Sequence, residues 1–89
     1  MEITEIKIFA VEEKRVKAYS SVVFDECFIV RDLKVIQGDN KLFVAMPSKK
    51  MKDGSYRDTV HPLNNDMRYK LETSVLEAYE KELNRKISL

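Results

Sequence analysis

The hydrophobic period changes once along this chain, and that change limits the folds it can adopt. Up to about residue 46, apolar side chains alternate with polar ones, which is the period of half-buried β-strands. From about residue 65 they recur every three or four residues, the spacing of an amphipathic α-helix. We therefore expect an antiparallel sheet followed by one C-terminal helix.

Charged or turn-forming segments divide the first part into four apolar stretches, residues 3–11, 16–24, 27–36 and 42–46. Gly38 and Asn40, in the last intervening turn, can adopt positive φ. Within the third stretch the apolar phase shifts at Arg31-Asp32, which predicts a β-bulge. Pro47 ends the fourth strand, because proline cannot donate a hydrogen bond to the ladder.

The second part predicts one helix from about residue 65 to 84. Asn64 or Asn65 can cap its first turn, where Asp66 suits the positive end of the helix dipole. One face is apolar and consists of Leu71, Val75, Ala78, Tyr79 and Leu83, widened by Met67 and Leu76. A single domain then spans residues 1–84, and residues 85–89 form a frayed tail.

These elements predict a two-layer α+β fold, with a four- to five-stranded antiparallel sheet and the helix on one face. A single helix leaves the opposite face of the sheet to water or to a partner. Phe9, Tyr19 and Val23 lie in the less buried phase of their strands. We expect a homodimer to cover them.

The chain offers little for catalysis or metal binding. Among 89 residues it has two glycines, one histidine and one cysteine, which leaves no room for a P-loop or a glycine-rich dinucleotide motif. A metal site needs several converging ligands, and Cys27 and His61 lie far apart in sequence. We expect Cys27 to be a small core residue in a strand, and His61 to help form the turn into the helix. Neither an enzyme nor a cofactor or metal site is predicted.

The sequence also favours one cellular compartment. A single cysteine excludes an internal disulfide framework and suits a reducing environment. The opening MEITEIKIF lacks the pattern of a secretory signal, and apolar runs such as LFVAM are far shorter than the roughly 20 residues that span a bilayer. We expect a cytoplasmic protein with no membrane insertion.

The stretch FVAMPSKKMKDGSYRD, residues 43–58, holds the one local excess of charge. Since the formal net charge of the chain is only +1, binding of a polyanion must depend on local charge. Clustered cations suit phosphates, and an exposed aromatic ring can stack on a base. The candidate side chains are Lys49, Lys50, Lys52, Arg57 and Tyr56. A second interpretation stays open, a solvated hairpin end in which Asp53 and Asp58 partly cancel the charge.

Two arginine–aspartate pairs, Arg31-Asp32 and Arg57-Asp58, allow two interpretations. They can form cross-strand charge contacts, each contributing roughly 0.2–1 kcal/mol. Alternatively, the arginine can bind a phosphate through both arms of its guanidinium. We favour the charge contact for Arg31 and leave both open for Arg57. The exposed charges of the helix are mixed in sign, which indicates a solvated face rather than a DNA recognition helix.

Several motifs, in order, make this chain resemble the SpoVG family, the stage V sporulation protein G or septation-protein family. They are MEIT, KAYSSVVFDECFIVRDLKVI, LFVAMPSKK, DGSYRD, HPLN and LEAY, spread over residues 1 to about 82. The resemblance implies a small bacterial cytoplasmic dimer with an antiparallel sheet and a C-terminal helix. It also implies a role in septum formation, sporulation and gene regulation, with binding of DNA, and of RNA in some members, and no catalysis.

By the same resemblance, the loop after the AMPS motif contacts nucleic acid, and this contact carries over to Ser48, Lys49, Lys50, Lys52 and Arg57. The chain departs from the family pattern at Lys41, where glycine is common, and at Met51-Lys52, where Thr-Pro is common. Loss of the proline frees a φ angle, and Lys52 adds a cation.

We therefore expect a dimeric nucleic-acid-binding regulator that contacts DNA or RNA phosphates through this basic loop. The alternative is a protein-interaction module of the division machinery, in which nucleic-acid binding is incidental.

Overall fold

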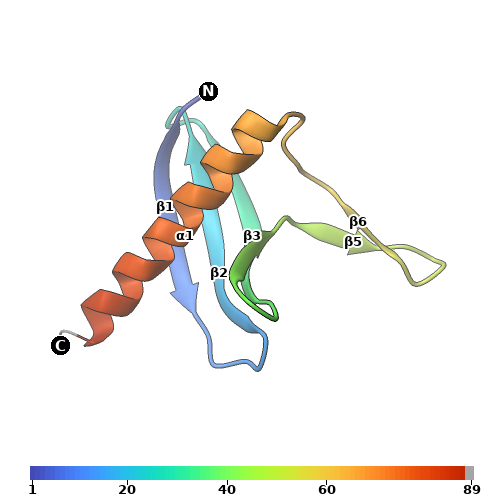
Figure 1. The fold of residues 1–89 in the computed structure, drawn as a ribbon. Coiled ribbons are helices and arrows are strands. Elements are labelled where there is room, and N and C mark those ends of the chain that lie inside the picture. Colours follow the sequence, from blue (N-terminus) through green and yellow to red (C-terminus); the bar gives the residue numbers. More distant parts are fainter. Residues whose placement is uncertain (88–89) are drawn as a thin grey trace.

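A computed structural model describes residues 1–87 as an antiparallel sheet, a separate hairpin and one long helix (Figure 1). The sheet contains β1 (Ile3–Ala10), β2 (Val16–Phe24), β3 (Phe28–Gln37) and β4 (Leu42–Ala45), in that order. The hairpin contains β5 (Ser48–Lys50) and β6 (Tyr56–Asp58), and α1 (Asn65–Ile87) follows it. The predicted α+β class is confirmed, with four strands in the main sheet.

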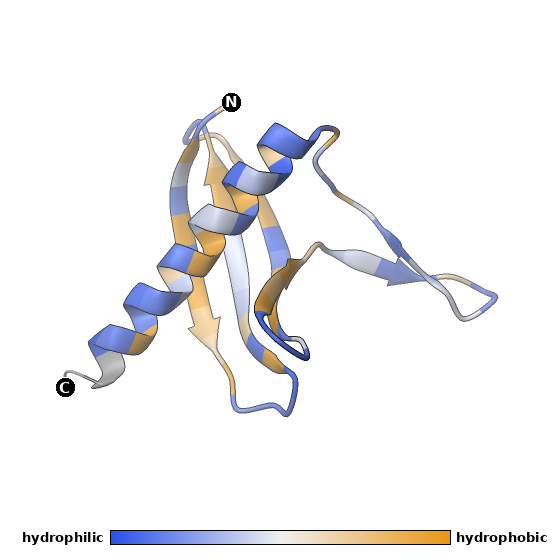
Figure 2. Ribbon diagram, in the orientation of Figure 1, coloured by the Kyte–Doolittle hydropathy of each residue, from blue (hydrophilic) through white to orange (hydrophobic). Residues whose placement is uncertain are grey.

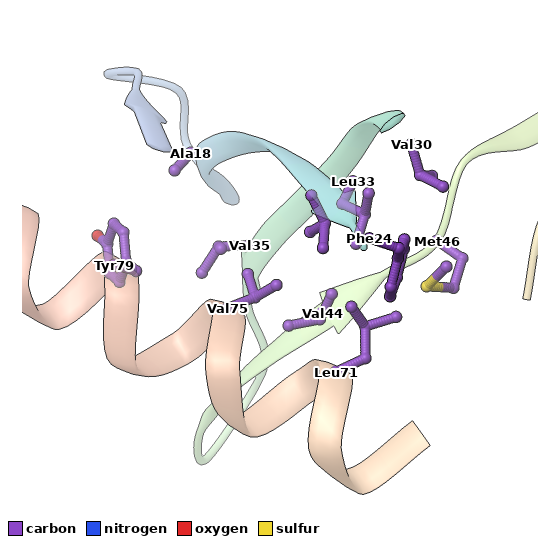
Figure 3. Packing of buried hydrophobic residues seen from close by; sticks show 11 residues of the cluster. Ala18, Phe24, Val30, Leu33, Val35, Val44, Met46, Leu71, Val75 and Tyr79 are labelled. Atoms are coloured by element: carbon purple, nitrogen blue, oxygen red, sulfur yellow. The ribbon is translucent and has the colours of Figure 1, made fainter. Parts of the chain in front are cut away.

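The core lies between α1 and the face of the sheet that α1 crosses (Figure 3). Val22, Leu33 and Val35 come from the strands and are fully buried. Their partners on α1 include Val75, which is also fully buried, and Leu71, of which only 3% is exposed. Burying an aliphatic side chain of this size contributes about 1.5–3 kcal/mol, so this interface supplies much of the stability. Figure 2 shows apolar residues on the strands of the sheet and as bands along the helix.

The predicted bulge in β3 is confirmed by the strand register. Ser20 pairs with Leu33 and Val22 with Val30, so two residues of β3 lie opposite one residue of β2. Those two are Arg31 and Asp32, and Asp32 has a φ of 67°. The extra residue shifts the alternation by one position, and this brings both Val30 and Leu33 onto the buried face.

The prediction that Cys27 is a core residue of a strand is wrong. Asp25 and Glu26 both have positive φ, and the Cys27 amide donates to the Phe24 carbonyl, which closes a tight turn between β2 and β3. The strand begins only at Phe28, and Cys27 is exposed. The connection between the strands therefore consists of Asp25, Glu26 and Cys27, one residue more than the two that separate the apolar stretches in the sequence.

The turn between β3 and β4 also differs from expectation, because neither Gly38 nor Asn40 adopts positive φ. Gly38 instead lies where there is little space for a side chain. A Cβ there would lie 3.1 Å from the Lys41 carbonyl oxygen and 3.2 Å from Cε1 of Phe43. The Gly38 amide donates to that same carbonyl and closes the turn.

The start of α1 agrees with the prediction, and its end lies later. Asn64 caps the helix, since its side-chain oxygen accepts a hydrogen bond from the Met67 amide at 2.8 Å. The helix continues to Ile87, three residues past the predicted end at residue 84. The last part of the predicted tail, residues 88–89, lies outside the described residues.

Candidate nucleic-acid interface

The basic stretch identified in the sequence forms the β5–β6 hairpin, which projects from the body of the molecule (Figure 1). Pro47 separates β5 from the main sheet, and the chain leaves the sheet at this point. The base of the hairpin is closed by Thr59, whose amide and hydroxyl both donate to the Pro47 carbonyl, at 2.8 and 3.2 Å. Every residue of both strands is exposed, so the hairpin buries none of its own side chains in the core.

The register of the hairpin places two cations directly opposite each other. Lys49 pairs with Arg57, while Lys50 pairs with Tyr56. Like charges in directly opposed positions repel and destabilise a two-stranded sheet. Within the described part of the chain, ion pairs join only Arg68 to Glu72 and Arg85 to Glu82, so the hairpin cations have no acidic partner. The arrangement provides uncompensated positive charge at an exposed site.

The tip of the hairpin is ordered by Asp53, whose carboxylate stays ionised. The Asp53 carboxylate accepts hydrogen bonds from the Ser55 hydroxyl at 2.6 Å and the Ser55 amide at 3.0 Å. These hydrogen bonds lower the pKa of Asp53 below its usual value of 3.8. Gly54, with a φ of 91°, makes the turn. Asp53 is thus engaged within the turn, and the charge of neighbouring Lys52 is left unpaired.

The six predicted contact residues therefore share one structural unit. Five of them lie on the two strands, and Lys52 lies in the tip turn. Tyr56 is 69% exposed, which leaves most of its ring free to stack on a base. The cross-strand partner of Asp58 is Ser48 rather than a cation, so the interpretation of Arg57-Asp58 as a cross-strand charge contact finds no support.

Arg31 lies elsewhere, in the bulge of β3. Together with Lys7, Phe9, Tyr19 and Asp32 it lines a hollow on the face of the sheet that α1 does not cover. It forms no ion pair with any residue from 1 to 87 within 4.0 Å, so the expected charge contact is absent there. The nearby charge of Glu13, which also accepts a 3.4 Å hydrogen bond from Tyr19, raises the pKa of the Tyr19 hydroxyl.

Two further residues lie near the hairpin, and the sequence did not identify either of them as a candidate contact residue. His61 and Arg68 line an open hollow with three residues of β6, namely Tyr56, Arg57 and Asp58. Arg68 is eleven residues from Arg57 along the chain, and it comes close only because the connection after β6 returns to the start of α1. The hydrophobic period of the sequence cannot predict such a contact, because the contact depends on the path of the chain between the two residues.

Among residues 1–87, no three histidine, cysteine or acidic side chains come together in a way that could hold a metal ion. Nor does the described part of the chain include a helix long and apolar enough to cross a membrane.

Comparison with known proteins finds the same resemblance over nearly the same part of the chain. The family model described as SpoVG matches residues 1–81. A septation protein SpoVG from Bdellovibrio bacteriovorus is 61% identical over 93% of this chain and 77% of its own length. Proteins of the same name from Anaeromyxobacter sp. (strain K) and Thermoanaerobacter sp. (strain X514) are 51% and 49% identical, over 96% and 91% of this chain and 84% and 89% of theirs.

Proposed function

The chain belongs to the SpoVG family, and from this membership we propose that it is a small dimeric nucleic-acid-binding regulator without catalytic activity. Because its relatives are named for septation, we assign it to cell-division septum formation in the cytoplasm, with sporulation as the related process. The observation that carries the nucleic-acid assignment is the pairing of Lys49 with Arg57 in an exposed hairpin whose cations form no ion pair with a carboxylate of residues 1–87.

The mechanism is contact with phosphates, with no bond made or broken. A polyanion relieves the repulsion between Lys49 and Arg57, so the arrangement that destabilises the free hairpin favours the bound one. Arg57 presents a planar guanidinium suited to two phosphate oxygens, whereas Lys49, Lys50 and Lys52 act as point charges. Tyr56 offers a stacking surface that accepts any base.

Dimerisation is supported by the face of the sheet opposite α1. Phe9 pairs with Tyr19 and Val23 with Ile29, and these four side chains share that face. Phe9 and Ile29 are 55% and 43% exposed. Charges of both signs surround them, which suits a second copy of the chain better than a polyanion. A dimer formed through this face would carry two basic hairpins, one from each protomer.

A salt series tests the nucleic-acid assignment. Binding of mixed-sequence DNA and RNA is measured by fluorescence anisotropy for wild type and for the triple variant Lys49→Ala, Lys50→Ala, Arg57→Ala. We expect wild-type affinity to fall steeply with salt. The variant should bind at least tenfold more weakly at low salt, with the slope of log K against log salt reduced by about 2 to 3.

The matched control removes the same charge from α1, with Lys70→Ala, Lys81→Ala and Arg85→Ala. It should bind nearly as wild type does, because these side chains lie outside the hairpin. If wild type fails to bind at low salt, or if both triple variants lose affinity and slope equally, the hairpin is not the contact site.

A protein-interaction role is the second candidate, and an apolar pocket of about 110 Å³ favours it. The pocket lies between the sheet and the start of α1, and its lining includes Phe28 and Val60, which are 63% and 42% exposed. Such a pocket can take one large apolar side chain of a partner. If Phe28→Ser abolished septum-related function in cells while nucleic-acid binding stayed intact, this second role would be the one selected.

A further inference from the structure

An open hollow lies where the chain returns from the hairpin to α1, outside the contact set that the sequence predicts. Its volume is about 470 Å³, and it is lined by Tyr56, Arg57 and Asp58 from β6, His61 from the connection, and Arg68 from α1. The lining thus includes two arginines and a histidine beside a single aspartate. This is the composition of a phosphate site rather than of a cation site.

The hydrogen bonding of His61 leaves one ring nitrogen available. Its Nδ1 lies 2.9 Å from the carbonyl oxygen of Pro62, which can only accept, so Nδ1 carries a proton and donates it. No other side-chain hydrogen bond of His61 occurs within residues 1–87. The Nε2 atom is therefore a free acceptor in the neutral ring and becomes a free donor once the ring is protonated.

Both arginines of the hollow also keep donors free. Arg57 has no ion pair in the part of the chain that the structure describes. Arg68 reaches Glu72 at 3.8 Å through one nitrogen, and its side chain is 44% exposed. An exposed contact of this length between residues i and i+4 holds the guanidinium weakly. An anion that enters the hollow can thus recruit Arg68 without breaking a strong interaction.

We propose that this hollow binds a phosphate of single-stranded nucleic acid in a proton-dependent manner. Arg57 and Arg68 contact the phosphate oxygens, protonated His61 donates from Nε2, and Tyr56 stacks on the adjacent base. The proposal rests on the proposed function. It adds His61 and Arg68 to the contact residues of the hairpin. It also predicts that the affinity for nucleic acid depends on pH.

The direction of this response follows from the charges that face His61. From β6 these are Arg57 and Asp58, with the neutral Tyr56, and from α1 it is Arg68. A bound phosphate favours the protonated ring, because the two carry opposite charges. By linkage, affinity must rise as the pH falls through the titration range of the ring. His61 is the only histidine of the chain, so the response can be assigned to it.

The experiment measures binding of a fluorescent single-stranded DNA of about 20 mixed nucleotides, and of the matching RNA, at about pH 5.5 and 7.5 and constant ionic strength. We expect wild type to bind about three- to tenfold more tightly at the lower pH. His61→Gln should bind with nearly the same affinity at both pH values, and so lose most of the gain that wild type shows at the lower one. Arg68→Gln should weaken binding at both.

Two further measurements separate this proposal from general charge effects. Arg85→Gln is the matched control, because Arg85 is also an arginine on α1 in contact with a glutamate, and it should leave affinity and pH response unchanged. In an NMR titration, the pKa of His61 should rise when the single strand is added, since a tenfold gain in affinity corresponds to a rise of about one unit.

The outcomes also distinguish this proposal from the one before it. If the hairpin triple variant loses binding while His61→Gln and Arg68→Gln match wild type at both pH values, the hollow is not a phosphate site and the hairpin assignment stands. An unchanged His61 pKa on saturation with DNA and RNA would overturn the proton dependence. Absence of any wild-type binding would remove both proposals together.

Discussion

At the scale of single residues, three non-glycine positions among residues 1–87 adopt positive φ, and each lies at a turn or a bulge of the sheet. Asp25 and Glu26 form the β2–β3 turn, and Asp32 lies in the bulge. The turn is held by the N-terminal segment, since the Asp25 carboxylate accepts a hydrogen bond from the Glu2 amide at 2.8 Å and the Glu26 amide donates to the Thr4 hydroxyl at 2.9 Å. These contacts offset the cost of a left-handed backbone at residues that have a Cβ.

Asp53 gives a prediction at the same scale. Its pKa is depressed by the hydrogen bonds from Ser55, so the order that it confers on the hairpin tip is fully present above the ordinary value of 3.8. That order is lost only as the pH falls through the lower value of the folded protein. An NMR titration should show the Ser55 amide and the Asp53 carboxyl moving together, below the range of an unperturbed aspartate. Coincident titration at the ordinary value would contradict the hydrogen bonds.

At the scale of elements, the hairpin and the helix obtain their stability differently. A two-stranded hairpin with every side chain exposed is marginal by itself, so β5–β6 depend on the closing hydrogen bonds at Thr59 and on the Asp53 turn. The helix depends on its buried face, where Leu71, Val75 and Tyr79 meet the sheet. The binding element can thus be altered with little effect on the body of the protein.

The helix cap provides a test of the stability of α1. Asn64→Ala removes the side-chain acceptor of the Met67 amide. We expect a loss of about 0.5–2 kcal/mol in the free energy of unfolding, measured by urea denaturation followed by circular dichroism. Asn65→Ala is the control, because Asn65 is already helical and caps nothing. Equal losses in the two variants would show that the cap lies elsewhere.

At the scale of the whole molecule, one helix over a four-stranded sheet leaves the second face of the sheet uncovered. Phe43, 40% exposed, extends the apolar surface of that face beyond Phe9 and Ile29. The hairpin extends away from both layers (Figure 1). The two surfaces are therefore separate, and self-association and nucleic-acid binding should be separable by mutation.

Sedimentation velocity at micromolar concentration tests self-association. We expect wild type to sediment as a dimer and Phe9→Asp as a folded monomer, because a charge placed in the uncovered face would be buried in the dimer without a partner. Tyr69→Asp is the control, since Tyr69 is 74% exposed on α1 and should leave the dimer intact. A monomeric wild type, or a Phe9→Asp variant that remains dimeric, would show that this face is not the interface.

Patterns that repeat along the chain determined most of the fold. Alternation in β2 and the three- and four-residue spacing in α1 identified the buried faces, because burial on one side of a regular element imposes its period on the sequence. The phase shift at Arg31-Asp32 identified the bulge for the same reason. The basic stretch was visible because its cations are neighbours in sequence.

Other features were decided by the tertiary structure alone, because no repeating pattern in the sequence corresponds to them. Cys27 is exposed because the turn before it consumes one more residue than the sequence suggested, and this outcome depends on contacts with Glu2 and Thr4. The opposition of Lys49 and Arg57 depends on hairpin register, which the tip turn sets. His61 and Arg68 meet Arg57 because the chain folds back after β6. Such contacts between residues distant in sequence are fixed by the path of the backbone, and local residue preferences carry no record of them.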